Sequence, residues 1–243
     1  MKAIETKNLT KRYGEITALD GLNLAIEQGE MLALLGVNGA GKTTAIKLLS
    51  CLAEPSEGEA WLCGHSILDA AQEVKHVIGV SPQETAVAKK LSVRENLQFI
   101  AEVYGAGKQE ASERVEKMIT RMGLETVSTR RAGTLSGGWQ RRLSIAMALI
   151  GEPKILFLDE PTLGLDVIAR HELWEQIRAL KGKTTVILTT HYLEEAEALC
   201  DRIAILAGGK LITVGTSEEI KALAGKESFE DAFVALCAGG VRA

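Results

Sequence analysis

The sequence predicts an α/β fold with a mainly parallel sheet, an antiparallel β layer at its N-terminal side and a helical insert. Three observations lead to this prediction. Short strand patterns broken by turn signals fill residues 3–26. A buried strand at 31–35 runs into a glycine-rich loop and a helix, and apolar strands alternate with helical patterns again in the second half of the chain. Such alternation is typical of a parallel sheet.

The first segment, residues 3–26, carries turn signals at Tyr13-Gly14-Glu15 and at Asp20-Gly21. Strands that are separated by turns of this length pair as antiparallel neighbours. We therefore expect an antiparallel layer that precedes the parallel core in the sequence.

A P-loop motif follows the strand at 31–35. Residues 36–43 read Gly-Val-Asn-Gly-Ala-Gly-Lys-Thr, and such glycines let backbone amides curl around phosphate oxygens at a helix N-terminus. From an exposed loop, Lys42 would reach the β and γ phosphates of ATP, Thr43 would bind Mg²⁺ and Thr44 would add a phosphate contact. The alternative is a glycine-rich turn with a solvated lysine. The motif indicates a P-loop NTPase core, whose predicted nucleotide-binding residues are Gly36, Asn38, Gly39, Ala40, Gly41, Lys42, Thr43 and Thr44.

The pattern becomes helical from residue 91 to residue 122. Apolar residues recur at i, i+3, i+4 and i+7 in two runs, 97–104 and 115–122. Ser92 and Glu95 form a capping-box pattern before the first run, and Gly123 after the second is a typical C-terminal stop. These features predict a helical subdomain over about 84–150.

Two adjacent acids end a buried strand in the second half of the chain. Residues 155–158 are apolar, and Asp159 and Glu160 follow them directly. A P-loop enzyme needs a carboxylate on a neighbouring strand to hold its metal ion, so Asp159 is the candidate ligand of Mg²⁺. Glu160 is the candidate general base, because a carboxylate at the mouth of the strand can polarise the attacking water. The alternative for Glu160 is an ordinary surface acid.

The α/β alternation continues towards the C-terminus. A helical pattern at 173–180 precedes an apolar strand at 185–190, and two strands at 203–206 and 211–214 are joined through Gly208-Gly209 as a hairpin.

Domain organisation follows from these patterns and from the length of 243 residues, which suffices for one large domain or two small ones. Thr216 and Glu219 form a second capping-box pattern that predicts a last short helix. We expect one domain over 1–225, with the helical subdomain inserted, and a short C-terminal tail over 226–243.

Composition and charge exclude several classes of protein. The hydrophobic content of 46% with 25% charged residues is typical of a globular protein, and the net charge of −4 argues against a general nucleic-acid-binding surface. The longest apolar runs, 31–35 and 145–150, are shorter than the roughly 20 residues that cross a bilayer, and the N-terminus lacks a signal-peptide pattern. We expect a cytosolic chain that neither spans a membrane nor binds nucleic acid. The four cysteines have no metal-site or disulfide spacing and are expected to be apolar fillers: Cys51, Cys63, Cys200 and Cys237.

Residues 135–138, Leu-Ser-Gly-Gly, distinguish this chain from other P-loop NTPases. A serine hydroxyl, glycine amides and a helix N-terminus together form a second phosphate cradle. Here the sequence resembles the ABC ATPases, whose signature motif begins with the same four residues and opens a helix. In that family, the signature of one subunit faces the γ-phosphate that the P-loop of the other subunit binds. The resemblance implies that Ser136, Gly137 and Gly138 contact ATP in a dimer, although Trp139 replaces the glutamine of the most familiar motif.

Five further positions match that family in order and surroundings. Tyr13 resembles the aromatic residue that stacks on adenine, with Ile16 as a second wall. Gln83 resembles the glutamine that senses Mg²⁺ and the γ-phosphate. Asp166 resembles a loop residue that crosses the dimer interface, and His191 resembles the histidine that contacts the γ-phosphate during catalysis. The local alternatives are a strand aromatic for Tyr13, a loop polar group for Gln83, a helix cap for Asp166 and a turn residue for His191.

The segments 189–197 and 228–233 resemble the ABC-2-type, drug-export branch of the family. This resemblance implies the ATP-hydrolysing subunit of an exporter, peripheral on the cytoplasmic face of the membrane. Its partners would be a second ATPase subunit, either identical or a close paralogue, and transmembrane permease subunits. The alternatives are an importer ATPase or a soluble ABC ATPase, although the chain lacks the long coiled coils of chromosome-organising ATPases and the second head of ribosome-acting ones. The cargo stays open.

Overall fold

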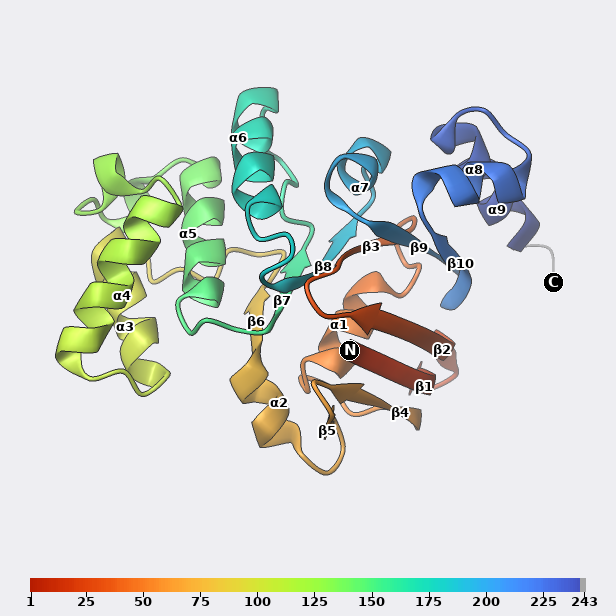
Figure 1. Ribbon diagram of the computed structural model, residues 1–243, viewed down its shortest axis with the longest axis horizontal. Helices are drawn as coiled ribbons and strands as arrows, with labels where there is room; N and C mark the ends of the chain where they lie inside the picture. Colours follow the sequence, from red (N-terminus) through yellow and green to blue (C-terminus); the bar gives the residue numbers. More distant parts are fainter. Residues whose placement is uncertain (241–243) are drawn as a thin grey trace.

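Two sheets organise the computed structural model, which describes residues 1–240 (Figure 1). The antiparallel sheet has the order β2-β1-β4-β5, and the mainly parallel sheet has the order β10-β9-β3-β8-β7-β6. This arrangement confirms the predicted α/β fold with an antiparallel layer. The strands are β1 (Lys2–Tyr13), β2 (Ile16–Glu27), β3 (Met31–Leu35), β4 (Glu57–Leu62), β5 (His65–Ser66), β6 (Ile78–Ser81), β7 (Ile155–Asp159), β8 (Thr185–Thr190), β9 (Arg202–Ala207) and β10 (Lys210–Gly215).

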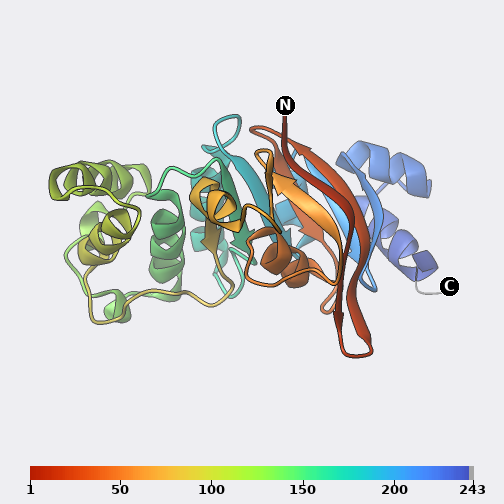
Figure 2. The same cartoon turned by 90° about the horizontal axis from the view of Figure 1, so that it is seen from below.

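Helices pack on both faces of the parallel sheet, and the antiparallel layer lies beyond one of these faces (Figure 2). The side chains of α1 share an apolar cluster with both sheets, whereas α5, α6 and α7 contribute to the cluster on the opposite face. The helices are α1 (Lys42–Leu49), α2 (Ala71–Val77), α3 (Val93–Val103), α4 (Lys108–Arg121), α5 (Gly137–Leu149), α6 (Val167–Arg178), α7 (Leu193–Leu199), α8 (Ser217–Ala224) and α9 (Phe229–Gly240). Two short 3₁₀ helices span Glu125–Val127 and Ala132–Thr134.

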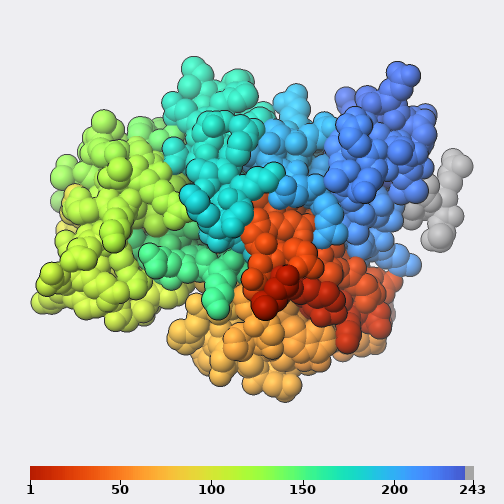
Figure 3. All heavy atoms as spheres, in the orientation of Figure 1, coloured from red at the N-terminus to blue at the C-terminus, as the bar shows by residue number. Residues whose placement is uncertain are grey.

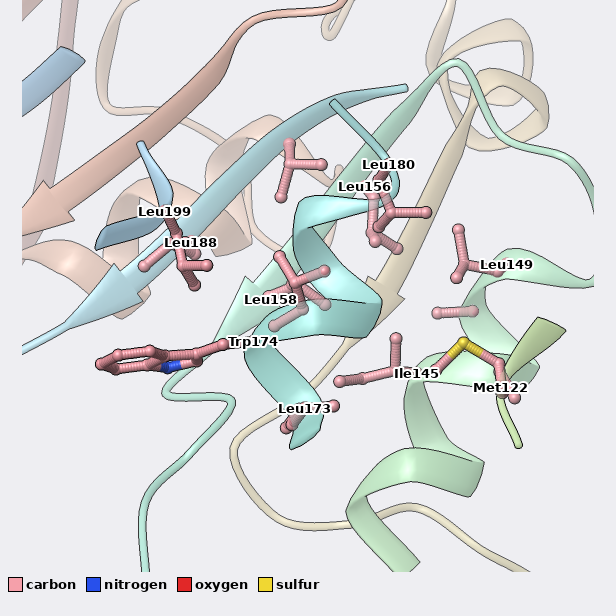
Figure 4. Packing of buried hydrophobic residues seen from close by; sticks show 14 of the residues in the cluster. Met122, Ile145, Leu149, Leu156, Leu158, Leu173, Trp174, Leu180, Leu188 and Leu199 are labelled. Carbon is pink, nitrogen blue, oxygen red and sulfur yellow. The ribbon is translucent and has the colours of Figure 1, made fainter. Parts of the chain in front are cut away.

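The central strands β3, β7 and β8 are buried along their whole length. Their side chains alternate between the two apolar clusters, so that Leu156 and Leu158 face α5 and α6 while Phe157 faces α1. Figure 4 shows the first cluster, in which Leu158 lies beside Leu173 and Trp174 of α6. Burial on both faces explains why these strands are continuous apolar runs in the sequence.

The expected turn at Asp20-Gly21 is wrong, because β2 continues through both residues. The pairing of β1 with β2 shifts register between Leu9 and Lys11, which makes this a β-bulge. Gly21 takes a left-handed φ of 60°, and its N–H donates to Thr10 Oγ1 at 2.9 Å. A glycine with positive φ serves a turn and a bulge equally well, so the residue type alone cannot separate them.

The elements β4, β5, α2 and β6 were not anticipated. They are short, and β4, β5 and α2 are only partly buried, which leaves little periodicity to detect. β6 forms the edge of the parallel sheet next to β7, and Gly79 lets α5 approach it closely. A Cβ atom at Gly79 would lie 2.2 Å from the carbonyl oxygen of Ala148.

The helical insert consists of α3, α4 and α5 and forms one end of the molecule, opposite α8 and α9 (Figures 1 and 3). Ser92 and Glu95 make the predicted capping box at the start of α3. Within residues 1–240, no helix combines the length and the apolar character that a membrane span requires.

The C-terminal part contains one helix more than expected. The β9–β10 hairpin and the Thr216 capping box of α8 are confirmed. The expectation that α8 is the last helix is wrong, because α9 occupies most of the tail 226–243, of which residues 241–243 lie outside the described residues. Phe229 and Ala232 of α9 are buried in the same cluster as α6 and α7, and residues 229, 232, 233 and 236 show a helical spacing that could have revealed it.

Candidate active site

A cleft of about 650 Å³ lies where the turn after β1 meets the loop between β3 and α1. It brings together residues from four separate segments of the chain. Most of the predicted nucleotide-binding residues line it: Tyr13, Ile16, Asn38, Gly39, Ala40, Gly41, Lys42, Thr43, Thr44 and Gln83. The candidate base Glu160 also lines the cleft, as do Thr17 and Ala18, which the sequence does not single out.

The P-loop needs its glycines for reasons of geometry. A Cβ atom at Gly36 would lie 2.4 Å from the carbonyl oxygen of Leu206, so no larger residue fits there. Gly39 and Gly41 have φ values of 80° and 103°, which a residue with a side chain adopts only with strain. The loop then enters α1 at Lys42, so the helix N-terminus faces the cleft with its partial positive charge.

The Lys42 side chain is folded into the loop rather than extended into solvent. Only 6% of the residue is exposed, which argues against the alternative of a solvated lysine, while Val37, Asn38 and Gly39 of the loop are exposed as expected. Its ammonium group donates to the carbonyl oxygens of Gly36 at 2.7 Å and Val37 at 3.3 Å, and lies 3.6 Å from Oε1 of Glu160. The cation is thus held at the base of the cleft, close to the candidate general base.

Asp159 and Thr43 form an oxygen pair beside Lys42. Thr43 Oγ1 lies 3.3 Å from Oδ1 of Asp159, and the Thr189 hydroxyl donates to the same oxygen at 2.5 Å. A carboxylate next to a hydroxyl is the kind of donor set that Mg²⁺ takes in nucleotide sites. These residues therefore fit the predicted metal ion, and Gln83 lines the same cleft.

Glu160 points into the cleft because of its backbone conformation. Its φ is 49°, a left-handed value that costs a residue other than glycine about 1–3 kcal/mol. The N–H of Glu160 donates to both oxygens of Thr189, at 3.0 Å to Oγ1 and 3.2 Å to the carbonyl. The carboxylate lies 2.7 Å from His191 Nδ1 on one side and faces Lys42 on the other. This arrangement gives Glu160 two polar partners and an open direction towards the cleft.

His191 is supported from the side by two further residues. The ring of Tyr192 lies 4.1 Å from the ring of His191, centroid to centroid, and the guanidinium of Arg170 lies 4.9 Å from the ring of Tyr192. Asp166 does not line the cleft and instead caps α6, since its Oδ1 accepts from the N–H of Ala169 at 2.9 Å. The helix-cap alternative for Asp166 is thus realised within one chain.

The signature residues Ser136, Gly137 and Gly138 do not line the P-loop cleft of the same chain. Gly137 borders a separate groove of about 410 Å³ that also runs past Gln83 and residues 163–165. Ser136 occupies the N-cap position of α5 without a side-chain cap bond, so its hydroxyl is not used by its own helix.

Trp139, at the fifth signature position, is engaged within its own chain. The Arg142 guanidinium lies 4.7 Å from the Trp139 ring, and Arg142 also donates to Glu172 Oε2 at 2.7 Å. Trp139 packs partly buried against the cluster around α5. Arg142 therefore links α5 to α6, and the Trp139 ring packs against its guanidinium.

Sequence reasoning missed Thr189 and Glu195 as parts of this site. Glu195 is fully buried on α7, and the indole N–H of Trp174 donates to its Oε1 at 3.1 Å. Burial raises the pKa of Glu195, and the nearby charge of Glu160 raises it further, against the opposing effect of neighbouring hydroxyls and the indole. The sequence shows an acid at position 195, but no local pattern indicates that this acid is buried.

We expect Glu195→Gln to become more stable relative to the wild type as the pH rises. Below the ordinary glutamate pKa of 4.5, Glu195 is protonated in both the folded and the unfolded state. Above pH 4.5, ionisation of Glu195 stabilises the unfolded state of the wild type. The free energy of unfolding of the wild type therefore falls as the pH rises, until the pH reaches the raised pKa of Glu195 in the folded state. The stability difference should grow by up to about 1.4 kcal/mol per pH unit within this window.

Urea unfolding of both proteins between about pH 4.5 and pH 8 measures this difference. Glu194→Gln, which removes an exposed carboxyl from the same helix, is the control. If the difference in the free energy of unfolding between Glu195→Gln and the wild type stays constant over this pH range, the result would contradict the raised pKa.

Comparison with known proteins agrees with this geometry. The model of the ABC transporter family matches residues 19–163. The chain is 41% identical over 229 residues to the daunorubicin resistance ATP-binding protein DrrA3 of Streptomyces coeruleorubidus, covering 94% of this chain and 72% of that protein. It is 42% identical over 214 residues to the Nod factor export ATP-binding protein I of Burkholderia orbicola (strain AU 1054), covering 87% and 70%.

Two solved structures resemble the fold over nearly its whole length. The structure of an ATP-binding subunit of an ABC transporter has a TM-score of 0.86 and 31% identity, with 96% of this chain and 99% of that chain covered. A dimeric, post-hydrolysis structure of the ATP-binding cassette MJ0796 bound to ADP and Pi has a TM-score of 0.78 and 28% identity, with 88% and 98% covered.

Proposed function

The chain belongs to the ABC transporter family as an ATP-hydrolysing subunit, and we propose that it powers an exporter by binding two ATP molecules between two such subunits. The observation that carries the proposal is the position of the Glu160 carboxylate, between His191 and Lys42 at the P-loop cleft. A base and a cation that face each other in this way suit the attack of water on a bound γ-phosphate.

In the proposed reaction, the P-loop amides and Lys42 hold the phosphates of ATP. Glu160 accepts the proton of the attacking water, and His191 orients the Glu160 carboxylate and contacts the γ-phosphate. Thr43, Asp159 and Gln83 hold Mg²⁺, which neutralises charge on the phosphates when it is bound. The Lys42 ammonium exchanges its bond to the Gly36 carbonyl for bonds to phosphate oxygens.

The adenine lies, in this proposal, against Tyr13 and Ile16. These residues flank the mouth of the cleft, and 48% of Tyr13 and 71% of Ile16 are exposed. Neighbouring exposed apolar side chains beside a polar cleft are typical of a ligand-binding groove. Adenine stacking on Tyr13 would cover this surface.

The second half of each ATP site comes from another subunit, an identical copy or a close paralogue. The support is that Ser136, Gly137 and Gly138 lie at the N-terminus of α5, where backbone N–H groups can bind phosphate, and do not line the P-loop cleft of their own chain. Facing the partner's P-loop, this cradle would bind the γ-phosphate that Lys42 of the other subunit holds. Asp166, at the start of α6, would lie at the same interface.

A separate transmembrane permease is the remaining partner, and the chain would lie on the cytoplasmic face of that membrane. Relatives named for daunorubicin resistance and Nod factor export support export as the direction. The surface proposed to meet the permease is the segment from Gln83 through α3, where Phe99, Val103 and Tyr104 are large, apolar and exposed.

Photo-crosslinking in membranes that contain the permease tests this contact. A photoreactive residue at Phe99 or Val103 should form adducts with the cytoplasmic loops of the permease, whereas the same probe at Lys7 in β1 should not. Adducts that form at Lys7 and are missing at Phe99 and Val103 would contradict the proposed contact.

A further inference from the structure

Arg141 is the one arginine of α5 that turns inward to the active site. Only 4% of the residue is exposed, and its guanidinium donates to three carbonyl oxygens. Nη1 donates to Pro82 at 2.6 Å, and Nη2 donates to Gln83 at 2.5 Å and to Glu160 at 3.2 Å. A single side chain thus joins the signature helix to the segment after β6 and to the residue after β7.

These bonds reach Gln83 and Glu160, two residues to which the proposed function gives roles in hydrolysis. The backbone of Glu160 is strained, and a strained residue keeps its conformation only if its surroundings fix it. Thr189 holds the N–H of Glu160, while Arg141 and the N–H of Leu163 hold its carbonyl oxygen. Arg141 therefore helps to fix the direction in which the Glu160 carboxylate points.

The charge of Arg141 is costly to bury and is not cancelled by a direct ion pair within residues 1–240. Burial lowers the pKa of its guanidinium, and the nearby carboxylates of Asp159, Glu195 and Glu160 oppose this effect. The guanidinium matches three carbonyl groups because it is a planar fork with five N–H donors. Lysine has a single ammonium centre and cannot bridge the same three acceptors.

We propose that Arg141 is a positioning residue for ATP hydrolysis, which locks Glu160 and the Gln83 segment to the signature helix α5. This inference rests on the proposed function of Glu160 and Gln83. Gly137, one helical turn before Arg141, belongs to the cradle that would bind the partner's ATP. A shift of α5 when that cradle closes would reach Glu160 and Gln83 through the Arg141 guanidinium.

The test compares Arg141→Lys and Arg141→Gln in the full chain. We expect kcat for ATP to fall about 10- to 100-fold, because small misplacements of reacting groups have effects of this size. The KM for ATP should stay within about twofold, because Tyr13 and the P-loop are untouched. The Mg²⁺ concentration for half-maximal rate should rise, since Gln83 is displaced.

Arg202→Gln is the control for a loss of stability alone. Arg202 donates to Glu30 Oε1 at 2.7 Å and to the Ala25 carbonyl at 2.7 Å. It lies at the N-terminal end of β9, which is parallel to β3, whereas the P-loop follows the C-terminal end of β3. At an equal drop in Tm, this variant should keep the wild-type kcat and Mg²⁺ dependence.

Three results would overturn the proposal: a wild-type kcat in Arg141→Lys, an equal loss of kcat in Arg202→Gln at equal Tm, or failure of both Arg141 variants to fold. Arg141→Lys keeps the buried charge and carries the test if Arg141→Gln does not fold. Turnover by the wild type and its loss in Glu160→Gln test the proposed function separately. A failure of the Arg141 proposal leaves those two results unchanged.

Discussion

Replacing Glu160 with glutamine should lower ATP hydrolysis by about 10²- to 10⁴-fold, the range for loss of a general acid–base group. The amide has the size of the carboxylate and can still contact His191 Nδ1, which lies 2.7 Å from Glu160 Oε2. It cannot accept the proton of water at neutral pH. Binding of ATP should survive, because the P-loop amides and Lys42 are unchanged. Phosphate release in single-turnover reactions measures the effect.

The matched control is Glu194→Gln, which removes an exposed carboxylate three residues after His191 in the sequence. It should retain the wild-type rate. A Glu160→Gln protein that hydrolyses ATP within about tenfold of the wild type would contradict the role of Glu160 as general base.

Replacing Lys42 with alanine should reduce hydrolysis to below about 1% of the wild-type rate, because a preorganised donor at the transferring phosphate is lost. The buried position of Lys42 adds a second effect. Its bonds to the carbonyls of Gly36 and Val37 disappear, and stability should fall by about 1 kcal/mol for a hydrogen bond that water can partly replace. Steady-state ATPase assays and thermal unfolding measure the two effects.

Lys47→Ala serves as the control for Lys42→Ala. Lys47 lies on the same helix, α1, and its side chain is exposed, so its removal takes away an equal charge without touching the loop. Wild-type turnover in Lys42→Ala would contradict the assignment of residues 36–43 as the phosphate-binding loop.

The sequence predicts the parallel core well because β3, β7 and β8 are buried on both faces and therefore read as unbroken apolar runs. The P-loop is equally predictable from the sequence. Close packing at Gly36 and left-handed backbone at Gly39 and Gly41 exclude residues other than glycine. Here local chemistry determines the residue type, so the pattern can be recognised along the chain.

Other parts depend on contacts between residues far apart in sequence. Arg141 reaches the Gln83 segment, 58 positions away, and nothing in the local pattern distinguishes it from Arg142, which turns outward to Glu172. Burial of Glu195 beneath Trp174 likewise arises only when α6 packs beside α7. The helix α9 differs from these cases, because residues 229, 232, 233 and 236 show a helical spacing within the segment for which we expected a tail.

The central proposal is that the P-loop of one chain and the signature of another share each ATP. Light scattering on Glu160→Gln tests it most directly, because ATP persists in this variant and stabilises whichever state binds it better. We predict a monomer without nucleotide, a dimer with ATP, and no dimer when Ser136→Arg is added, since the larger side chain blocks the γ-phosphate cradle. A Glu160→Gln protein that binds ATP yet remains monomeric at high concentration, or that dimerises equally well with Ser136→Arg, would contradict the shared site.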